Sequence, residues 1–461
     1  MRRSVYTLGA TVLAGLLTAT GAVAETAPVD ETPGVHSEEH DRPDLDDGEA
    51  YMGWSLRAEQ TAQPRALAGR AAPAAVPAPP GVPGIDVSSW QRNVDWRGQW
   101  NQGKRFAYVK ATEGVAYRNP YFGQQYNGSY DIGMFRGSYH FGRPDIDAGA
   151  KEQAAYFVAN GGNWSPDGRT LPGVLDIEYN PVAGADKCYD LSPSQMVRWV
   201  RDFVTEYKRR TGREAVIYTN LDWWGQCTGN STAFSETNPL WVARWSSSVG
   251  TLPGGWANHT FWQYTDVPLD QDQFNGTLDQ LATFATFRDV PADYVFGVEI
   301  SWLLGQDITT GYDDGTFRPR NKISREAMAA FLYRYAGAPA FRAPARSPFS
   351  DLPTTAPFYK EITWLLAQGI TTGYDDGTFR PRNQISREAM AAFLYRFEDV
   401  SGYRPGPSDF SDVPTGYVFG KEIAWLADQG ITTGYDDGTF RPRGKISREA
   451  TAAFLYRLDR R

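Results

Sequence analysis

The sequence predicts an α/β protein, in which a TIM-like β/α barrel is followed by a mainly helical module of three repeats. Two observations support this prediction. Between Gly84 and about Leu281, short apolar runs typical of buried strands alternate with longer amphipathic stretches typical of helices. Beyond Leu281, one motif occurs three times at almost constant spacing, which indicates a repeat architecture. With 461 residues, the chain is long enough for two or more folded units.

The barrel is expected to span residues 81–284. Its clearest strand candidates are Phe106–Val109, Gly173–Leu175, Ala215–Tyr218 and Leu240–Ala243. A helix is expected from Ser192 to Arg210, because Ser192 suits the N-cap and Pro193 the first helical position. Strands that alternate with helices imply a parallel sheet, and a pattern of roughly 200 residues suits a closed barrel.

The three repeats are expected at residues 285–346, 347–407 and 408–461. Their shared motif, Gly-Tyr-Asp-Asp-Gly-Thr-Phe-Arg-Pro, begins at Gly311, Gly373 and Gly434, at intervals of 62 and 61 residues. Each copy is expected to hold two helices, such as 360–368 and 386–397, separated by an Asp-Asp-Gly turn. Because one copy of this length buries little apolar surface, the three copies are expected to pack against one another.

The N-terminal residues predict export. Basic residues at positions 2 and 3, an apolar run and Ala22-Val23-Ala24 together indicate a signal peptide over residues 1–24. Residues 25–80 are acidic and then Ala/Pro-rich, which predicts a disordered linker or a pro-region. No later stretch is expected to span a membrane. In an oxidising compartment the two cysteines, Cys188 and Cys227, are expected to form one disulfide.

Composition narrows the classes of function. The formal net charge is -8, and no basic stripe is interleaved with aromatic residues, so a nucleic-acid partner is not expected. The chain has 15 Trp and 25 Tyr, whose rings suit the faces of sugars, although most of them are expected to fill cores. With four His and no Cys/His cluster at ligand spacing, neither a metal site nor another cofactor is expected.

Acidic residues at strand ends are the remaining candidates for chemistry. Asp176 and Glu178 follow an apolar strand at positions i and i+2, which places both side chains on the same side. Two carboxylates held close together raise one pKa, so that one group can serve as a general acid. Asp86 follows another apolar run, and Asp270 and Asp272 follow Phe-Trp-Gln-Tyr near the end of the barrel. From spacing alone, such an acid is more often a helix cap or a solvated loop residue than a catalytic group.

Five ordered motifs resemble the glycoside hydrolase family 25 lysozymes, and the resemblance covers about Gly84 to Leu281. The motifs begin at Gly84 (GIDVSSWQ), Tyr108 (YVKATEG), Arg136 (RGSYHF), Leu175 (LDIE) and Phe261 (FWQY). A bacterial branch of this family also has a cysteine pair where Cys188 and Cys227 lie. The three C-terminal copies resemble S-layer homology repeats, over about Phe287 to Leu458.

The resemblance to family 25 implies a β/α barrel that cleaves the β-1,4 bond between N-acetylmuramic acid and N-acetylglucosamine in peptidoglycan. It implies that Glu178 protonates the glycosidic oxygen and that Asp176 orients the acetamido group or stabilises the cationic centre. Asp86 and Asp270 are expected to complete the network, with Asp272 as the alternative to Asp270. For the substrate groove the resemblance implies three aromatic residues, each of which could instead have a packing role: Tyr139, Tyr218 and Trp245.

The resemblance to S-layer homology repeats implies attachment to a secondary cell-wall polysaccharide, which is often anionic. Arg325, Arg387 and Arg448 occupy the arginine position of the family's Ile-Thr-Arg-Ala-Glu motif, here Ile-Ser-Arg-Glu-Ala. A guanidinium group suits a carboxylate ligand, although each arginine could instead pair with a neighbouring acid. Together the resemblances predict a secreted, monomeric, wall-associated muramidase. A non-catalytic glycan-binding protein on a lysozyme-like barrel is the alternative.

Overall fold

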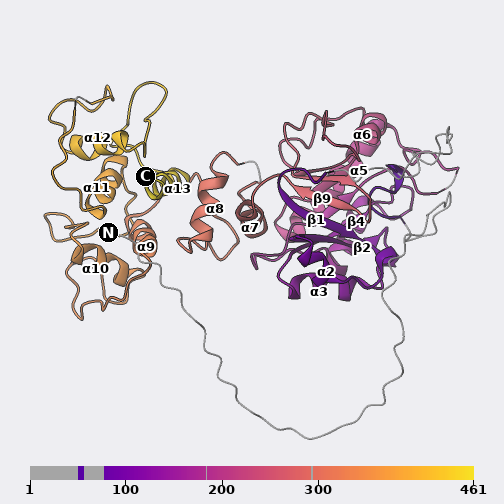
Figure 1. Ribbon diagram of the computed structural model, residues 1–461, viewed down its shortest axis with the longest axis horizontal. Coiled ribbons are helices and arrows are strands. Elements are labelled where there is room, and N and C mark those ends of the chain that lie inside the picture. Colours follow the sequence, from indigo (N-terminus) through magenta and orange to yellow (C-terminus); the bar gives the residue numbers. More distant parts are fainter. Residues whose placement is uncertain (1–49, 57–76, 183, 292–293, 407) are drawn as a thin grey trace, which may run out of the picture. The chain divides into compact units, whose positions relative to one another are not determined.

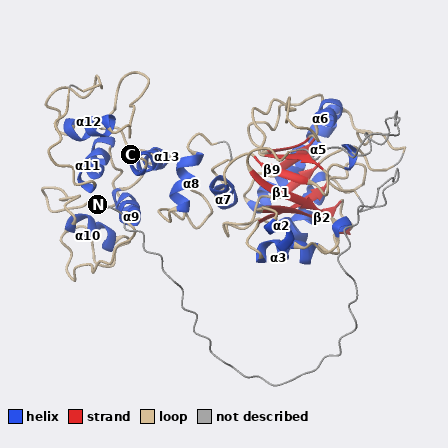
Figure 2. Cartoon of the chain, viewed as in Figure 1, coloured by secondary structure: helices blue, strands red, loops and turns tan. Residues whose placement is uncertain are grey.

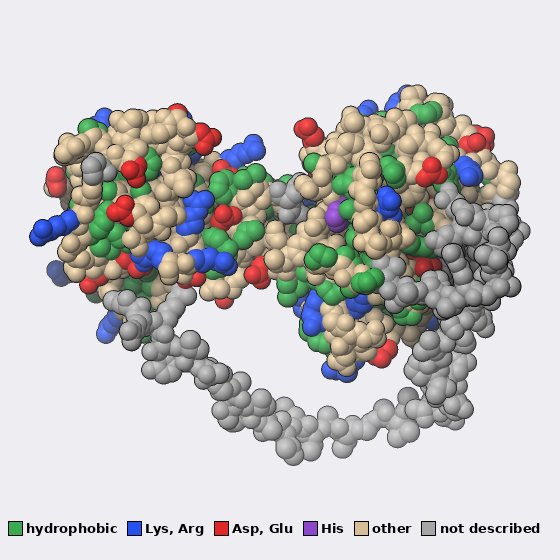
Figure 3. Space-filling model, turned by 45° about the horizontal axis from the view of Figure 1, so that its top comes forward, with side chains coloured by type: hydrophobic (Ala, Val, Ile, Leu, Met, Phe, Trp, Pro, Cys, Tyr) green, Lys and Arg blue, Asp and Glu red, His purple; other side chains and the backbone are tan. Residues whose placement is uncertain are grey.

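The computed structural model describes residues 50–56, 77–182, 184–291, 294–406 and 408–461. The expected signal peptide and most of the expected linker or pro-region lie outside the described residues. Strands are concentrated in the barrel region, whereas the C-terminal repeats consist of helices and loops (Figure 2). No helix of the described part is long and apolar enough to cross a membrane. On the face shown in Figure 3, basic and acidic side chains are interspersed.

Eight strands close the predicted barrel. They are β1 (Val82–Val87), β2 (Phe106–Glu113), β4 (Phe135–Phe141), β5 (Val174–Asp176), β6 (Val216–Thr219), β7 (Leu240–Ala243), β8 (Phe261–Thr265) and β9 (Gln271–Phe274). The strand order is β1-β9-β8-β7-β6-β5-β4-β2, and pairing of β1 with β2 closes the ring. The short strand β3 (Tyr117–Arg118) extends β2 as a hairpin.

The last strand departs from the all-parallel arrangement that the sequence predicts. Neighbouring strands from β1 to β8 are parallel, but β9 runs antiparallel to both β8 and β1. The physical reason is the short connection between Thr265 and Gln271, because so few residues allow a hairpin but no helical crossover. As a consequence, β9 begins at the face of the barrel where the parallel strands end.

Helices cover the outside of the barrel, with α2 and α3 on one side of the strands and α5 and α6 on the other (Figure 1). The bounds are α2 (Trp96–Asn101), α3 (Phe122–Asp131), α4 (Ala150–Phe157), α5 (Pro193–Thr211), α6 (Leu221–Thr228) and α7 (Leu278–Thr286). The predicted helix start is confirmed, since Ser192 has extended backbone and its N–H donates to Gln195 at 2.9 Å. The buried face of α5 includes Val200 and Phe203.

Aromatic rings fill part of the barrel interior. Tyr108 and Trp241 have ring centroids 4.9 Å apart, and Phe261 lies 5.4 Å from each of them. All three side chains are fully buried, so this part of the interior is packed and leaves no channel. The predicted disulfide joins Cys188 to Cys227 in α6, with their Cα atoms 5.2 Å apart.

The three repeats share one hydrophobic core, as predicted. Their helices are α8 (Gly297–Gly305), α9 (Arg325–Tyr335), α10 (Tyr359–Ala367), α11 (Arg387–Phe397), α12 (Gly420–Asp428) and α13 (Arg448–Asp459). The second helix of each repeat packs against the first helix of another repeat, in the pairs α9 with α10, α11 with α12 and α13 with α8. The packing therefore closes on itself as a three-membered ring.

Candidate active site

Four carboxyl groups are buried near the end of the barrel at which the parallel strands finish. Asp86 lies near the end of β1, Asp176 ends β5, and Glu178 follows two residues later. Asp272 joins them from β9, because that strand begins at this end. Each of the four side chains is at most 1% exposed. Burial of several carboxyl groups is costly unless protons are retained, so this end of the barrel favours protonated acids.

The pair formed by Asp176 and Glu178 has the electrostatics of a proton donor and its partner. Burial raises the pKa of Glu178 to about 7. Burial and then the negative charge of Glu178 raise the pKa of Asp176 well above its usual range. Apart from its coupling to Glu178, Asp176 has no hydrogen-bond partner among the described residues. Asp176 is therefore a buried acceptor that a ligand at this end of the barrel could satisfy.

Gln263 joins an acid of the site to two aromatic residues. The sequence did not identify this role. Its Nε2 donates to Asp86 at 2.8 Å. Its Oε1 accepts from the Tyr218 hydroxyl at 2.8 Å and from the Trp245 indole nitrogen at 3.1 Å. Gln263 belongs to the Phe-Trp-Gln-Tyr motif, but the motif alone does not show that the amide joins an acid to two aromatic residues. The structure thus brings Tyr218 and Trp245 to the same place as Asp86.

Asp270 and Asp272 occupy different surroundings, although both come from the start of β9. Asp272 is fully buried and its negative charge, after burial itself, is the main cause that raises the pKa of Asp86. Asp270 is 6% exposed, and its charge contributes to the raised pKa of the Tyr139 phenol after burial, Asp86 and Asp176. The assignment of Asp270 as the fourth acid therefore stays a prediction, with Asp272 closer to Asp86 in its electrostatic effect.

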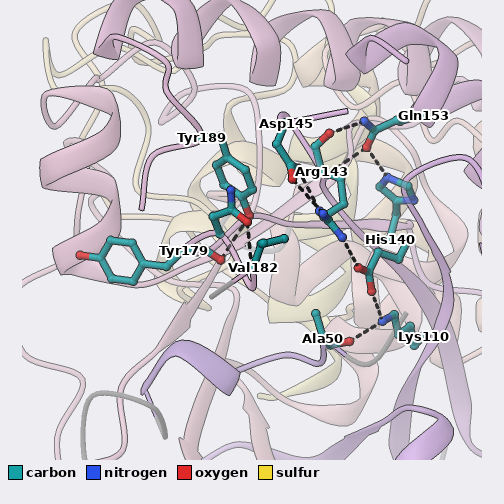
Figure 4. Close-up of polar contacts among 11 residues, drawn as sticks. Ala50, Lys110, His140, Arg143, Asp145, Gln153, Tyr179, Val182 and Tyr189 are labelled. Carbon is teal, nitrogen blue, oxygen red and sulfur yellow. Dashed lines mark hydrogen bonds and ion pairs between the residues drawn. The ribbon is translucent and has the colours of Figure 1, made fainter. Parts of the chain in front are cut away.

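A chain of charges runs from the buried Lys110 to Asp145 at the surface (Figure 4). The ammonium group of Lys110 donates to Glu113 at 2.7 Å, and Glu113 also accepts from Arg143 at 3.0 Å. Arg143 continues to Asp145 with two hydrogen bonds of 2.9 and 2.8 Å. Because Lys110 is fully buried and its charge lowers the pKa of Asp176, this chain supplies positive charge next to the acids.

A short segment from the N-terminal region also reaches the acids. Gly53 and Ser55 belong to Ala50–Leu56, which the sequence placed in a linker or pro-region. The Gly53 N–H and the Ser55 hydroxyl both donate to the carboxyl group of Glu178, at 2.8 and 2.5 Å. In retrospect, the signal is a cluster of apolar residues, Tyr51, Met52 and Trp54, within an otherwise polar stretch.

The three predicted arginines of the repeats form a ring of equivalent contacts, here called the arginine ring (Arg325, Arg387 and Arg448). The Nε of each donates to a phenylalanine carbonyl in another repeat, at 2.6 to 2.8 Å. Each guanidinium group also lies over three aromatic rings, as Arg325 does over Tyr374, Phe379 and Phe393. All three are 5 to 6% exposed, so the arginine ring contributes to the junctions between repeats.

Each member of the arginine ring has an aspartate near enough for its charge to act on the guanidinium group: Asp351 for Arg325, Asp412 for Arg387 and Asp289 for Arg448. Within the described ranges, none of its three members forms an ion pair, whereas other arginines of the repeats do, such as Arg318 with Asp314 at 3.0 Å. The predicted alternative, pairing with a neighbouring acid, therefore takes the form of longer-range attraction rather than of direct ion pairs in the described part. Burial of guanidinium groups without a direct ion pair is costly, and an anionic ligand could offset part of that cost. No group of three His, Cys, Asp or Glu side chains in the described residues is arranged to hold a metal ion.

Comparison with known proteins identifies the families that the two parts of the chain resemble. The family described as "Glycosyl hydrolases family 25" matches residues 85–272, and "S-layer homology domain" matches residues 286–329, 348–391 and 409–452. Lysozyme M1 of Streptomyces globisporus is 42% identical over 292 residues, which cover 62% of this chain and 95% of that protein. An N,O-diacetylmuramidase of Arthroderma benhamiae is 49% identical over 207 residues, covering 44% of this chain and 86% of that protein.

Each of two further matches covers less than half of the chain. The crystal structure of a lysozyme from Streptomyces coelicolor is 45% identical, covers 45% of this chain and 97% of that one, and has a TM-score of 0.43. Cell surface glycoprotein 1 of Acetivibrio thermocellus is 34% identical over 157 residues, which cover 32% of this chain and 7% of that protein.

The protein is thus a glycoside hydrolase whose buried acids lie at the end of a β/α barrel. It belongs to the glycosyl hydrolases family 25, and it carries three S-layer homology repeats after the catalytic barrel.

The raised pKa of Glu178 predicts how activity depends on pH. A general acid must carry its proton, so kcat/KM is expected to fall about tenfold per pH unit above the pKa of about 7. Initial rates on purified cell walls between pH 5 and 9 measure this limb, with circular dichroism at each pH to confirm the fold. Activity that rises steadily from pH 7 to 9 contradicts the assignment of Glu178 as the acid.

Proposed function

We propose that the protein is a muramidase that hydrolyses the β-1,4 bond between N-acetylmuramic acid and N-acetylglucosamine of peptidoglycan. The observation that carries this proposal is the fully buried Glu178, whose pKa is raised to about 7, next to Asp176. A carboxyl group with such a pKa holds a proton near neutral pH and can deliver it to the leaving glycosidic oxygen.

Asp176 acts as the partner of Glu178 rather than as a second acid donor. Glycosidases with two carboxyl groups use the second one as a nucleophile, as a base for water or, with N-acetylated sugars, as a partner of the substrate's own acetamido group. We favour the acetamido route for this chain. Apart from its coupling to Glu178, Asp176 has no hydrogen-bond partner in the described part, and an acetamido N–H would be a matched donor.

The remaining residues hold this pair and the sugar. Gln263 fixes Asp86 through a hydrogen bond, and the same amide orients the rings of Tyr218 and Trp245. Tyr139 lies on β4, between β2 and the strand that ends in Asp176. The aromatic residues offer flat apolar surfaces, which suit the CH-rich faces of sugar rings. We assign these residues to substrate binding and Asp86, with Asp270, to the support of the catalytic pair.

Substitution of the acid tests the enzymatic proposal. Glu178→Gln keeps the size of the side chain but removes the transferable proton, so turnover is expected to fall by about 10²- to 10⁴-fold. Clearing of a suspension of purified walls measures the rate, and sedimentation with walls measures binding. Glu236→Gln, the same substitution at an exposed acid of the barrel domain, is the matched control and should clear walls like the unchanged protein. Near-normal clearing by Glu178→Gln removes it from the acid role.

The same experiment separates the enzyme from the alternative of a non-catalytic glycan-binding protein. A binding protein would sediment with the walls without clearing them, and Glu178→Gln would then change nothing. The presence of Asp86, Asp176 and Glu178 together at one end of the barrel supports the enzyme, because a decayed site has no need for three buried acids.

We further propose that the repeats hold the enzyme at the cell wall through an anionic secondary cell-wall polysaccharide. The support is the arginine ring, whose three guanidinium groups are almost fully buried and form no direct ion pair in the described residues. A carboxylate of the polymer would supply a direct partner and accept hydrogen bonds from the terminal guanidinium nitrogens. Export across the membrane, as the N-terminal residues predict, would bring the repeats to this polymer.

Conservative substitution of the arginine ring tests the attachment. Replacing Arg325, Arg387 and Arg448 by Lys keeps the charge but removes the planar group with several donors. Sedimentation with walls is expected to weaken by about tenfold or more, while thermal unfolding confirms that the repeats remain folded. Walls from which the secondary polymer has been extracted should bind the unchanged protein equally poorly.

A matched set of arginines serves as the control. Arg334, Arg396 and Arg457 recur at one position of the three repeats, and each donates to an isoleucine carbonyl of its own repeat. Their replacement by Lys should leave sedimentation unchanged. Equal binding by both triple variants contradicts a role of the arginine ring in polymer recognition.

A further inference from the structure

The segment Ala50–Leu56, here called the cleft segment, is packed against the barrel although it precedes the first strand by many residues. Ala50 is 1% exposed, Met52 is fully buried and Ser55 is 2% exposed. Met52 belongs to the same hydrophobic cluster as barrel residues such as Tyr139 and Tyr218. A loosely attached linker would leave such side chains in solvent, so the cleft segment is firmly packed onto the barrel in this state.

Two donors of the cleft segment engage the proposed acid. The Gly53 N–H donates to Oε1 of Glu178 at 2.8 Å, and the Ser55 hydroxyl donates to Oε2 at 2.5 Å. Both oxygens of the carboxyl group are therefore used by the same protein chain. Asn220, at the N-cap of α6, donates to the Ser55 hydroxyl at 3.4 Å and holds it from the other side.

The cleft segment also covers the groups expected to hold the sugar. A Cβ atom added at Gly53 would lie 2.6 Å from Oε1 of Gln263, 3.0 Å from the Trp245 ring and 3.3 Å from the Tyr218 hydroxyl. There is no free space between Gly53 and these three side chains.

Its first residues extend the contact along the cleft. The ring of Tyr51 packs edge-on against Trp90, with centroids 6.2 Å apart. The carbonyl of Ala50 accepts a hydrogen bond from Lys110 (Figure 4). The cleft segment thus touches the acid, the aromatic residues and the chain of charges together.

We propose that the cleft segment is a built-in inhibitor, which occupies the place of the glycan and must leave before substrate can enter. This inference rests on the proposed function of the same site. A general acid acts only within hydrogen-bond reach of the oxygen that it protonates. With both oxygens of Glu178 bonded to Gly53 and Ser55, no glycosidic oxygen can take that position.

The hydrogen bonds from Gly53 and Ser55 also favour the ionised form of Glu178, which cannot act as a general acid. A carboxyl group that accepts hydrogen bonds on both oxygens is stabilised in its ionised form. Burial raises the pKa of Glu178, but the hydrogen bonds from Ser55 and Gly53 lower it. When the cleft segment leaves, Glu178 loses both donors, so its protonated form is favoured. The same movement frees the space next to Glu178 for the glycan.

Covalent connection makes such a short inhibitor effective. Seven residues would bind weakly as a free peptide, but a tether to the barrel gives them an effective concentration on the order of millimolar. Glycan must compete with this local concentration as long as the connection to β1 is intact. Displacement by a polymeric substrate, or cleavage of the connecting chain, would start activity.

Substitution of Gly53 in the full chain tests the inference without altering the barrel. Gly53→Val places atoms where Gln263 and Trp245 already lie, and Gly53 has a φ of +82° that a β-branched residue rarely adopts. The cleft segment should then leave the site. Clearing of purified walls is expected to become about tenfold faster or more, as the loss of a charge-assisted hydrogen bond implies.

Gly103→Val is the matched control. Gly103 also has a positive φ, of +92°, but a Cβ atom there meets nothing within 4 Å. This variant shares the backbone strain without the collision in the cleft, and it should clear walls at the rate of the unchanged chain. Equal rates for the unchanged chain and Gly53→Val, with walls cleared by both, overturn the inference and leave the proposed function intact.

Hydrogen exchange provides a readout that does not depend on activity. The peptide that contains Gly53 should be protected in the unchanged full chain and should exchange at least about tenfold faster in Glu178→Ala, which lacks the acceptor. Exchange of this peptide at the rate of an unfolded chain overturns the inference. If no variant clears walls, the proposed function fails, and with it the inhibitory role, even where protection shows that the cleft segment occupies the site.

Discussion

The burial of several carboxyl groups at one end of a packed barrel is the constraint on which the rest of this structure depends. Asp86, Asp176, Glu178 and Asp272 are removed from solvent, and each has a raised pKa because ionised groups are poorly solvated there. The barrel tolerates this cost because its aromatic interior and its outer helices supply the stability. The catalytic proposal follows directly, since the same burial that is unfavourable for folding prepares a proton donor.

The polar groups around the acids reduce the free-energy cost of burying the carboxyl groups, but they do not remove it. The amide of Gln263 binds Asp86, and the chain from Lys110 through Glu113 to Arg143 brings positive charge near Asp176. The cleft segment does the same for Glu178 with a backbone N–H and a hydroxyl. A glycan that replaces the cleft segment must provide comparable donors and acceptors, which explains how one site accommodates an inhibitor and a substrate in turn.

The sequence predicted the barrel, the disulfide and the mutual packing of the repeats, because these depend on local apolar patterns and on residue spacing. It did not predict the reversed direction of β9, which is decided by the short connection after Thr265. Nor did it predict the cleft segment. Gly53 and Ser55 are distant from Glu178 along the chain, and only the folded barrel brings them together. The role of Gln263 was missed for the same reason.

In the repeats, too, the sequence did not predict contacts between residues that are distant along the chain. The spacing of the motif predicted three copies, whereas the closed ring of contacts made by Arg325, Arg387 and Arg448 depends on how one copy meets another. These arginines stabilise the junctions and also form no direct ion pair in the described residues. A structural role and a binding role are thus compatible, since the carbonyl contact uses Nε and leaves the terminal nitrogens for a ligand.

The most direct test of the central claim is mass spectrometry of the reducing ends that the protein creates in purified peptidoglycan, after borohydride reduction. Cleavage by a muramidase predicts that the new ends carry reduced N-acetylmuramic acid. New ends that carry reduced N-acetylglucosamine, or no new ends at all after complete incubation, contradict the claim.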